Sequence, residues 1–439
     1  MKIFPGYRFY FVAISCVVLL FFGYFSSLVF ILAKGLTISL LIFTFADIIL
    51  LFFIKGRIAL ERFLPDRFSN GDENEVAFSI VNQYPVEVSL LIFDELPAQF
   101  QLRDFRIELE LKSEKQAIKT YNLRPTERGE YGFGKTNVLV NSRLGLIKRR
   151  FKFGAPKVVK VYPSFLNLKK YEISAISQSL KLGGQKQIKR VGQSTEFDHI
   201  KGYVLGDDPR YINWKASARK GNLMVNHYAD EKSQLIYSVL DKGRPMKMPF
   251  GGMTLLDYAI NASLVLSNVA IKKGDRAGLV TFQHKPETFI PALKRNLQIN
   301  YLLETLYNQK TQFNEPDFAT LYWFLMQKIK QRSLLLLYTN FESNYSLERQ
   351  LPFLKMINRH HLLLLVFFRN TELDLVIKER YTSAIDIYNK SIAKQIIDEK
   401  ASAQKILLQN GILSLYTSPE NLNTSVINKY IEIKTKRLF

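Results

Sequence analysis

Residues 196–241 read EFDHIKGYVLGDDPRYINWKASARKGNLMVNHYADEKSQLIYSVLD, and they mark the point where the pattern of the chain changes. Their first part is dense in turn formers and charged residues, whereas their last seven residues, LIYSVLD, form an apolar run of strand length. After this run the chain alternates strand-like and helix-like segments, and before it no such alternation occurs. The stretch therefore leads into a single α/β fold.

The C-terminal part, residues 235–439, has the pattern of a doubly wound α/β domain. Continuous apolar runs such as 334–338 and 362–368 predict strands covered on both faces, hence a largely parallel sheet. We expect further strands at 235–241, 276–282 and 412–418, an edge strand at 287–293, and helices at 253–275, 296–309, 317–330, 346–360, 372–409 and from 419. Ligands of such sheets lie beyond the carboxyl ends of the strands, which points to residues 241–246 and 339–343.

Two different segments precede this domain. Residues 63–163 contain short runs of alternating apolar and polar residues separated by turn signals, which predict a small antiparallel sandwich, an immunoglobulin-like spacer. Residues 164–234 combine a basic linker, with SLKLGGQKQIKR at 179–190, and the strap that leads into the α/β domain. The linker is suited to lie near anionic headgroups.

The N-terminal segment, residues 1–62, predicts a membrane anchor. Residues 9–33 carry no charge, and residues 35–54 are interrupted only by Asp47, so each run is long enough to cross roughly 30 Å of hydrocarbon. Only Lys34 and Gly35 are left as a connection, which predicts a transmembrane hairpin with that turn. A signal peptide is disfavoured because the apolar run is too long and no cleavage site of small residues follows.

The cations that flank the two runs predict the orientation of the anchor. Positive charges gather before the first run and after the second, with one between: Lys2, Arg8, Lys34, Lys55, Arg57 and Arg62. We therefore expect a protein of the bacterial inner (plasma) membrane. By the positive-inside rule, both of its ends and its soluble domains face the cytoplasm. Asp47 is costly inside a span. Either it has a function there, or it lies off-centre and meets water, Ser39 or a neighbouring helix.

Composition narrows the classes of partner. The formal net charge is +22, and the cations are spread along the chain, which favours an anionic surface: phospholipid, nucleic acid or an acidic protein. Cys16 is the single cysteine, so no intrachain disulfide and no cysteine metal cage can form.

The block at 190–241 resembles the signature of domain-of-unknown-function family 58. The residue types that carry the resemblance occur in order as Glu196, Tyr203, Gly206, Asp207, Arg210, Trp214, Ser217, Arg219 and Glu231. The resemblance implies that the α/β domain is von Willebrand factor A-like, and that the protein works with a MoxR-type AAA+ ATPase. It implies no general biochemical activity.

A von Willebrand A domain usually holds a divalent cation with Asp-x-Ser-x-Ser after its first strand, a loop Thr, and an Asp after its fourth strand. The matching positions here are Asp241, Gly243, Pro245, Thr254 or Thr320, and Asn340. Two hydroxyls and one carboxylate are missing, and Lys242 and Arg244 are adjacent, so we expect no metal and no other cofactor. The face is instead expected to be basic and to suit an acidic side chain or phosphate. Glu342 keeps a magnesium site open as an alternative.

The charged strap has two competing interpretations. In one, it folds onto the α/β domain through buried ion pairs of Asp207 and Asp208 with Arg210 or Arg219, above Trp214; in the other, it docks a partner.

Catalysis has little support in this sequence. The acid–base candidates, His199, His227, Glu231, Asp207 and Asp208, match no nucleophile-elbow, His-Glu-x-x-His or phosphate-loop motif. The adjacent His360 and His361 have diverging rings and are expected at the edge of the core.

These observations favour a membrane-anchored, non-enzymatic scaffold or adaptor whose α/β domain binds a protein partner, a MoxR-type ATPase in envelope or complex assembly. A nucleic-acid or anionic-surface binder is the alternative, suggested by the charge and by Tyr203, Tyr211 and Trp214 among cations. An envelope hydrolase with an unrecognised site is a third.

Overall fold

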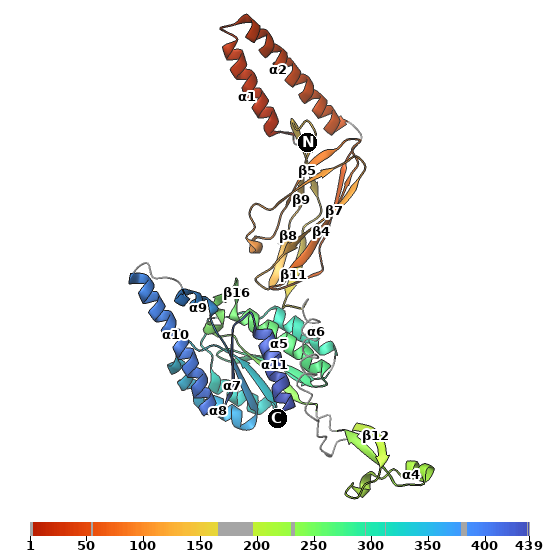
Figure 1. The fold of residues 1–439 in the computed structure, drawn as a ribbon, viewed down its shortest axis with the longest axis vertical. Coiled ribbons are helices and arrows are strands. Elements are labelled where there is room, and N and C mark those ends of the chain that lie inside the picture. Colours follow the sequence, from red (N-terminus) through yellow and green to blue (C-terminus); the bar gives the residue numbers. More distant parts are fainter. Residues whose placement is uncertain are drawn as a thin grey trace. The chain divides into compact units, whose positions relative to one another are not determined.

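The structure is a computed structural model that describes residues 3–53, 56–165, 196–229, 233–294, 296–311, 313–378, 384–436 and 438. The chain has a mixed α/β composition and divides into two compact units, Met1–Tyr162 and Pro163–Phe439 (Figure 1). The basic stretch at 179–190 lies outside the described residues.

Two apolar helices open the first unit. After strand β1 (Ile3–Pro5) come α1 (Tyr7–Phe22) and α2 (Ser27–Ile48), which continues as the π-helical turn η1 (Ile49–Phe53). The two helices pack against each other as a hairpin (Figure 1). Within the described residues, the continuous helix Ser27–Phe53 is long and apolar enough to cross a membrane. The 16 residues of α1 span about 24 Å at 1.5 Å per residue and fall below that length.

The predicted turn at Lys34 and Gly35 is wrong, because both residues lie inside α2. The chain reverses at residues 23–26, where the Gly23 amide donates to the Leu19 carbonyl (2.9 Å) and the next helix follows Ser26. A Cβ on Gly23 would lie 2.9 Å from Cα of Phe30, so only glycine permits this approach of the two helices. Charge was the wrong signal for the turn, since the residues that form it are uncharged.

The rest of the first unit is a β-rich domain. Its strands are β2 (Ile58–Phe63), β3 (Arg67–Ser69), β4 (Asn74–Asn82), β5 (Val88–Asp94), β6 (Arg106–Leu111), β7 (Gln116–Leu123), β8 (Gly129–Phe133), β9 (Thr136–Ser142), β10 (Ile147–Phe153) and β11 (Lys157–Tyr162). They form sheets in the orders β1-β10-β9-β5-β6, β2-β4-β7 and β3-β11-β8, antiparallel except for the β3–β11 pair. The predicted β-rich segment is present, and its first strand begins at Ile58 rather than after 63.

Alternating burial explains how these sheets form a core. In β4, Val76, Phe78 and Ile80 are buried while the residues between them are more exposed, as expected for strands with one face against a core. A polar network lies inside this domain: Arg62 pairs with Asp94 (2.5 Å), whose carboxylate also accepts from the hydroxyl of Tyr121 (2.5 Å).

The helical hairpin is fixed to the β-rich domain. Asp47 is fully buried, and its Oδ2 accepts from the amides of Leu146 (3.1 Å) and Ile147 (2.9 Å). The Leu51 carbonyl accepts from the hydroxyl of Tyr84 (3.1 Å) and from Arg149. Asp47 thus lies towards the end of its helix, as the off-centre interpretation expected, but its protein partners are backbone amides at the start of β10 rather than Ser39 or a helix.

The second unit contains the predicted doubly wound sheet. Its strands are β14 (Leu235–Asp241), β17 (Arg276–Phe282), β18 (Pro286–Leu293), β19 (Leu334–Tyr338), β20 (Leu362–Phe368) and β21 (Leu413–Thr417), in the order β18-β17-β14-β19-β20-β21. In chain order this arrangement is 3-2-1-4-5-6, the order of a doubly wound sheet. All pairs are parallel except β17–β18, so β18 is the antiparallel edge strand.

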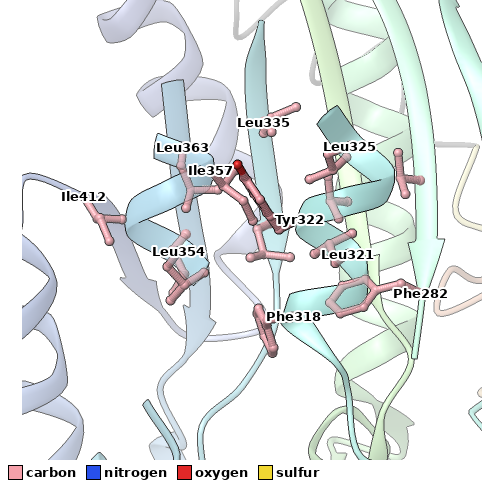
Figure 2. Packing of buried hydrophobic residues seen from close by; sticks show 14 of the residues in the cluster. Phe282, Phe318, Leu321, Tyr322, Leu325, Leu335, Leu354, Ile357, Leu363 and Ile412 are labelled. Atoms are coloured by element: carbon pink, nitrogen blue, oxygen red, sulfur yellow. The ribbon is translucent and has the colours of Figure 1, made fainter. Parts of the chain in front are cut away.

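Helices cover both faces of this sheet. They are α5 (Leu255–Lys272), α6 (Asn296–Tyr307), α7 (Phe318–Lys328), α8 (Asn344–His360), α9 (Thr371–Lys378), α10 (Ala384–Gln409) and α11 (Leu422–Thr435). On one face, Phe318 and Leu321 of α7 and Leu354 of α8 pack with Leu335 and Leu363 of the strands (Figure 2). The helices α5, α6 and α11 pack together on the other face. The short elements η4 (Arg244–Lys247), β15 (Pro249–Phe250) and β16 (Met253–Thr254) follow β14.

Candidate binding site at the carboxyl edge of the sheet

The carboxyl ends of four parallel strands place the candidate site. Asp241 ends β14, Asn340 follows β19, Arg369 follows β20, and Tyr416 lies near the end of β21. Because the strands are parallel, their carboxyl ends meet at one edge of the sheet, where ligands of doubly wound folds bind.

Asp241 is fully buried and bonded within the protein. Its Oδ2 accepts from the hydroxyl of Thr339 (2.6 Å), and its Oδ1 accepts from the amide of Gly243 (2.7 Å). Burial raises the pKa of this carboxyl to about 6, although both hydrogen bonds act in the opposite direction. Both carboxylate oxygens of Asp241, which a metal would require as ligands, are therefore already hydrogen-bonded, and these bonds hold the loop after β14 in place.

Gly243 stands where the cation motif would have its first serine, and the structure leaves no room for one. A Cβ at this position would lie 2.7 Å from Cδ of Pro316 and 3.1 Å from the carbonyl oxygen of Asn314. The Asn314 carbonyl also accepts from the Arg244 amide (3.0 Å), which holds that segment in place. The Pro316 ring and the Asn314 carbonyl therefore crowd the position that a serine Cβ would take.

Neither threonine candidate faces this site with a free hydroxyl. Thr254 caps α5, and its hydroxyl donates to Asp257 (2.5 Å). Thr320 lies in the first turn of α7 and donates to Asp317 (2.6 Å). Across the part of the chain that the structure describes, no three His, Cys, Asp or Glu side chains are grouped to hold a metal ion.

The expected basic face is largely neutralised. Lys242 is only 4% exposed and bonds Glu287 and Oε1 of Gln309 (3.0 Å), so it points into the protein and not toward a ligand. Arg244 pairs with Glu342 (2.9 Å), the residue considered as a substitute metal ligand. The expectation of a basic face is therefore wrong at Lys242, which is buried against Glu287, whereas Arg244 stays exposed in a surface pair with Glu342.

Asn340, at the position of the missing carboxylate, bonds a lysine that sequence reasoning missed. The Lys400 ammonium, from the middle of α10, donates to Oδ1 of Asn340 (2.8 Å) and to the carbonyl of Phe341. Burial lowers the Lys400 pKa to about 8, and the nearby Glu342 and Glu399 act to raise it. A single lysine within a helix that contains many gives no local signal, so only the fold identifies it.

A mostly apolar pocket opens beside Lys400. Its volume is about 240 Å³, and its walls come from the β15–β16 segment, the ends of β20 and β21, α9 and α10. The lining residues are Met248, Pro249, Phe250, Leu255, Asn340, Glu342, Phe368, Arg369, Asn370, Leu373, Ile396, Ile397, Lys400, Tyr416 and Pro419. An apolar cavity with a few polar groups is the usual form of a ligand site.

The signature residues form a separate small hairpin. Strands β12 (Glu196–Gly202) and β13 (Met224–Ala229) pair, with η3 (Pro209–Tyr211) and α4 (Trp214–Lys220) between them. Asp207 accepts from Lys201 (2.8 Å) and from the Val204 amide (3.0 Å) in a turn where Gly206 has φ 109°. Ser217 accepts from the Met224 amide (2.8 Å), which ties α4 to β13. The Tyr203 amide donates to Leu223.

The buried ion pairs expected of this strap are not found among its described residues. Asp208 does approach Arg210 (3.8 Å), but both are exposed, and Trp214 is 71% exposed rather than packed beneath them. Arg219 is also exposed. Glu231 and the side chains of Glu196 and His227 lie outside the described part.

The remaining histidine candidates divide between surface and core. His199 lies opposite His227 in the β12–β13 register and is exposed. His361 is buried, and neither ring nitrogen has a hydrogen-bond partner among the residues that the structure describes. Burial lowers its pKa to about 4. His361 therefore lies in the core.

Comparison with known proteins gives a family match and a distant relative. The model described as "Protein of unknown function DUF58" matches residues 199–376. The uncharacterized protein YeaD of Bacillus subtilis (strain 168) is 24% identical over 187 residues, 43% of this chain. The match spans 44% of that relative's length.

Solved structures resemble parts of the chain only weakly. The conserved hypothetical protein BatB from Bacteroides thetaiotaomicron is 10% identical, covering 46% of this chain and 99% of that one, with a TM-score of 0.31. The CARDB domain of PF1109 from Pyrococcus furiosus is 14% identical, covering 25% of this chain and 96% of that one, with a TM-score of 0.18.

Proposed function

From the premise that this chain belongs to the DUF58 family, we propose that it is a membrane-anchored, non-enzymatic adaptor that docks a protein partner at the carboxyl edge of its sheet. The pocket beside Lys400 carries this proposal. It combines apolar walls with a partly buried cation, while the described residues at the same edge assemble no metal site and no nucleophile with its base.

The anchor is proposed to cross the membrane twice, with both ends in the cytoplasm. The length of Ser27–Phe53 supports a span, and its packing against α1 supports a hairpin. Tyr24 and Phe25 are exposed at the hairpin tip, where aromatic side chains suit a membrane–water interface. Arg8 bonds the carbonyls of Arg143 and Leu144, so at least one flanking cation lies at the β-rich end of the hairpin.

The α/β domain is proposed to be of the von Willebrand A type without its cation. The 3-2-1-4-5-6 strand order and an aspartate at the end of the first strand support this assignment. The proposed partner is a MoxR-type AAA+ ATPase acting in envelope or complex assembly, on the basis of the family resemblance. Exposed side chains of the signature hairpin, such as Trp214, are a second surface available to that partner.

Affinity capture from native membranes tests the proposal. The full chain with a C-terminal tag is captured after mild cross-linking, once with ATP and once with ADP, and bound proteins are identified by mass spectrometry. We expect an AAA+ ATPase in at least one nucleotide state. A Lys400→Glu variant should lose it and Lys394→Glu, an exposed lysine of the same helix, should retain it. Recovery of no AAA+ protein in either state would contradict the partner assignment.

A further inference from the structure

Lys400 carries a charge that the protein does not neutralise with a bonded acid. Its ammonium has three N–H donors, and its partners in the described residues are two neutral oxygens, those of Asn340 and Phe341. No carboxylate lies within ion-pair distance among those residues, whereas the nearby Lys242, Arg244 and Arg369 each have one. A largely buried ammonium with a remaining donor favours an external anion.

The cavity beside this ammonium is apolar and small. Phe250, Leu373, Ile396 and Tyr416 line it, and its volume of about 240 Å³ lies below the range of about 300–1,000 Å³ that is typical of drug-sized ligands. A single large apolar side chain suits it better than an extended cofactor. An apolar group with a carboxylate attached would satisfy both the walls and Lys400.

An exposed apolar row leads away from the pocket along α10. Ile396 lines the cavity, and Ile392, Tyr388 and Ile385 precede it at intervals of three or four residues, which places them on one face of the helix. All four are exposed. A free fatty acid or a small metabolite would fill the pocket and leave this row uncovered, whereas a chain segment leaving the pocket would cover it.

We propose that the pocket binds the C-terminal residue of a partner protein, with its apolar side chain between α9 and α10 and its α-carboxylate on the Lys400 ammonium. The residues before that terminus lie along the row Ile385, Tyr388, Ile392 and Ile396. The inference rests on the proposed adaptor function, for which it supplies the chemistry of recognition.

Calorimetry with the full chain in phosphatidylcholine nanodiscs tests this inference, because detergent would compete for an apolar pocket. The probes are N-acetyl-Leu-Leu-Phe with a free carboxylate, the same peptide as its amide, and octanoate. The acid should bind at least tenfold more tightly than the amide. Lys400→Met should remove that preference, whereas Lys394→Met should keep it. Ile392→Ser should weaken both peptides without changing their ratio.

Several outcomes would overturn the inference. Equal binding of acid and amide, or an unchanged preference in Lys400→Met, would remove the role of the ammonium. Octanoate binding without peptide binding would reassign the pocket to a fatty acid. If Lys400→Met unfolds, Ile396→Trp serves instead: it should fill the cavity and abolish binding of the acid, and retained binding would refute the site.

The two proposals fail separately. Peptide binding without capture of an ATPase would leave the pocket chemistry in place and remove only the MoxR-type partner. Capture of an ATPase that the Lys400→Met variant retains, together with absent peptide binding, would place the docking surface elsewhere and refute the pocket.

Discussion

Restoring the missing serine should destabilise the domain and yield no metal site. In the Gly243→Ser variant, the new Cβ must lie 2.7 Å from Cδ of Pro316, 2.9 Å from Oδ1 of Asp241 and 3.1 Å from the carbonyl oxygen of Asn314. These are a proline ring, a buried carboxylate and main chain, so none can move aside as the end of a flexible side chain could. Accommodation requires a shift of the 313–317 segment away from β14.

The magnitude follows from the known cost of overpacking, about 1–3 kcal/mol. Since a loss of 1 kcal/mol lowers Tm by about 2–4 °C in domains of 150–250 residues, the unfolding transition of the α/β domain should shift down by several degrees. Differential scanning calorimetry of the full chain in nanodiscs measures the shift. Pro245→Ser is the matched control, because it adds the second missing hydroxyl of the motif at a partly exposed position.

Adding Mg²⁺ should not recover the lost stability of Gly243→Ser, even when Pro245→Ser and Asn340→Asp are combined with it. In that triple variant the new carboxylate at 340 meets the Lys400 ammonium, which already bonds the amide oxygen there (2.8 Å). A ligand-linked rise in Tm with millimolar Mg²⁺ would refute the reasoning. It would show that the 313–317 segment and the Lys400 ammonium can move aside to admit the cation.

Three further outcomes are expected. Asp47→Ala leaves the buried amides of Leu146 and Ile147 without an acceptor, which costs about 1–3 kcal/mol for each. Hydrogen exchange should show both amides at least tenfold less protected, while the control Asp47→Asn keeps most of the protection. The pKa of His361 is lowered to about 4, below its unfolded value of about 6.5, so the free energy of unfolding falls as pH drops from 6.5 to 4. Between pH 7 and pH 4, the His361→Phe variant should therefore lose about 2–3 kcal/mol less of this free energy than the wild type does, as measured by denaturant unfolding. A reporter fused after residue 439 should be active only in the cytoplasm, and periplasmic activity would reverse the proposed orientation.

Periodicity predicted the α/β sheet because burial on both faces leaves a direct signature in sequence. The runs at 334–338 and 362–368 are strands buried along nearly their whole length, and the weaker pattern at 287–293 is the antiparallel edge. In the N-terminal hairpin the turn was instead predicted from the charge of Lys34, because both helices are too apolar for a period to mark where they end. The turn there depends on the close approach of Gly23 to Phe30, a tertiary contact that hydropathy does not report.

The positions of the cation motif show which features of a site a sequence motif predicts and which it does not. Loss of the hydroxyls at 243 and 245 was visible in the sequence, and it is the reason for expecting no divalent cation there. The partners of the neighbouring cations were not visible. Lys242 and Arg244 look like a basic patch in sequence, but they pair with Glu287 and Glu342, which lie 45 and 98 residues further along the chain. Charge counted along a chain thus overstates the charge that a folded surface presents.

Lys400 is the opposite case, since a residue without any local signal becomes the main free charge of the site. It reaches Asn340 from 60 residues away, and its amide partner cannot neutralise it as the aspartate expected at that position would. With an aspartate there, the lysine would form a closed ion pair, and its charge would no longer be available to a ligand in the pocket. The Asn340→Asp variant should therefore weaken binding of a peptide carboxylate about as much as Lys400→Met does while preserving the cation. Unchanged affinity in Asn340→Asp would mean that the ammonium is not what the ligand meets.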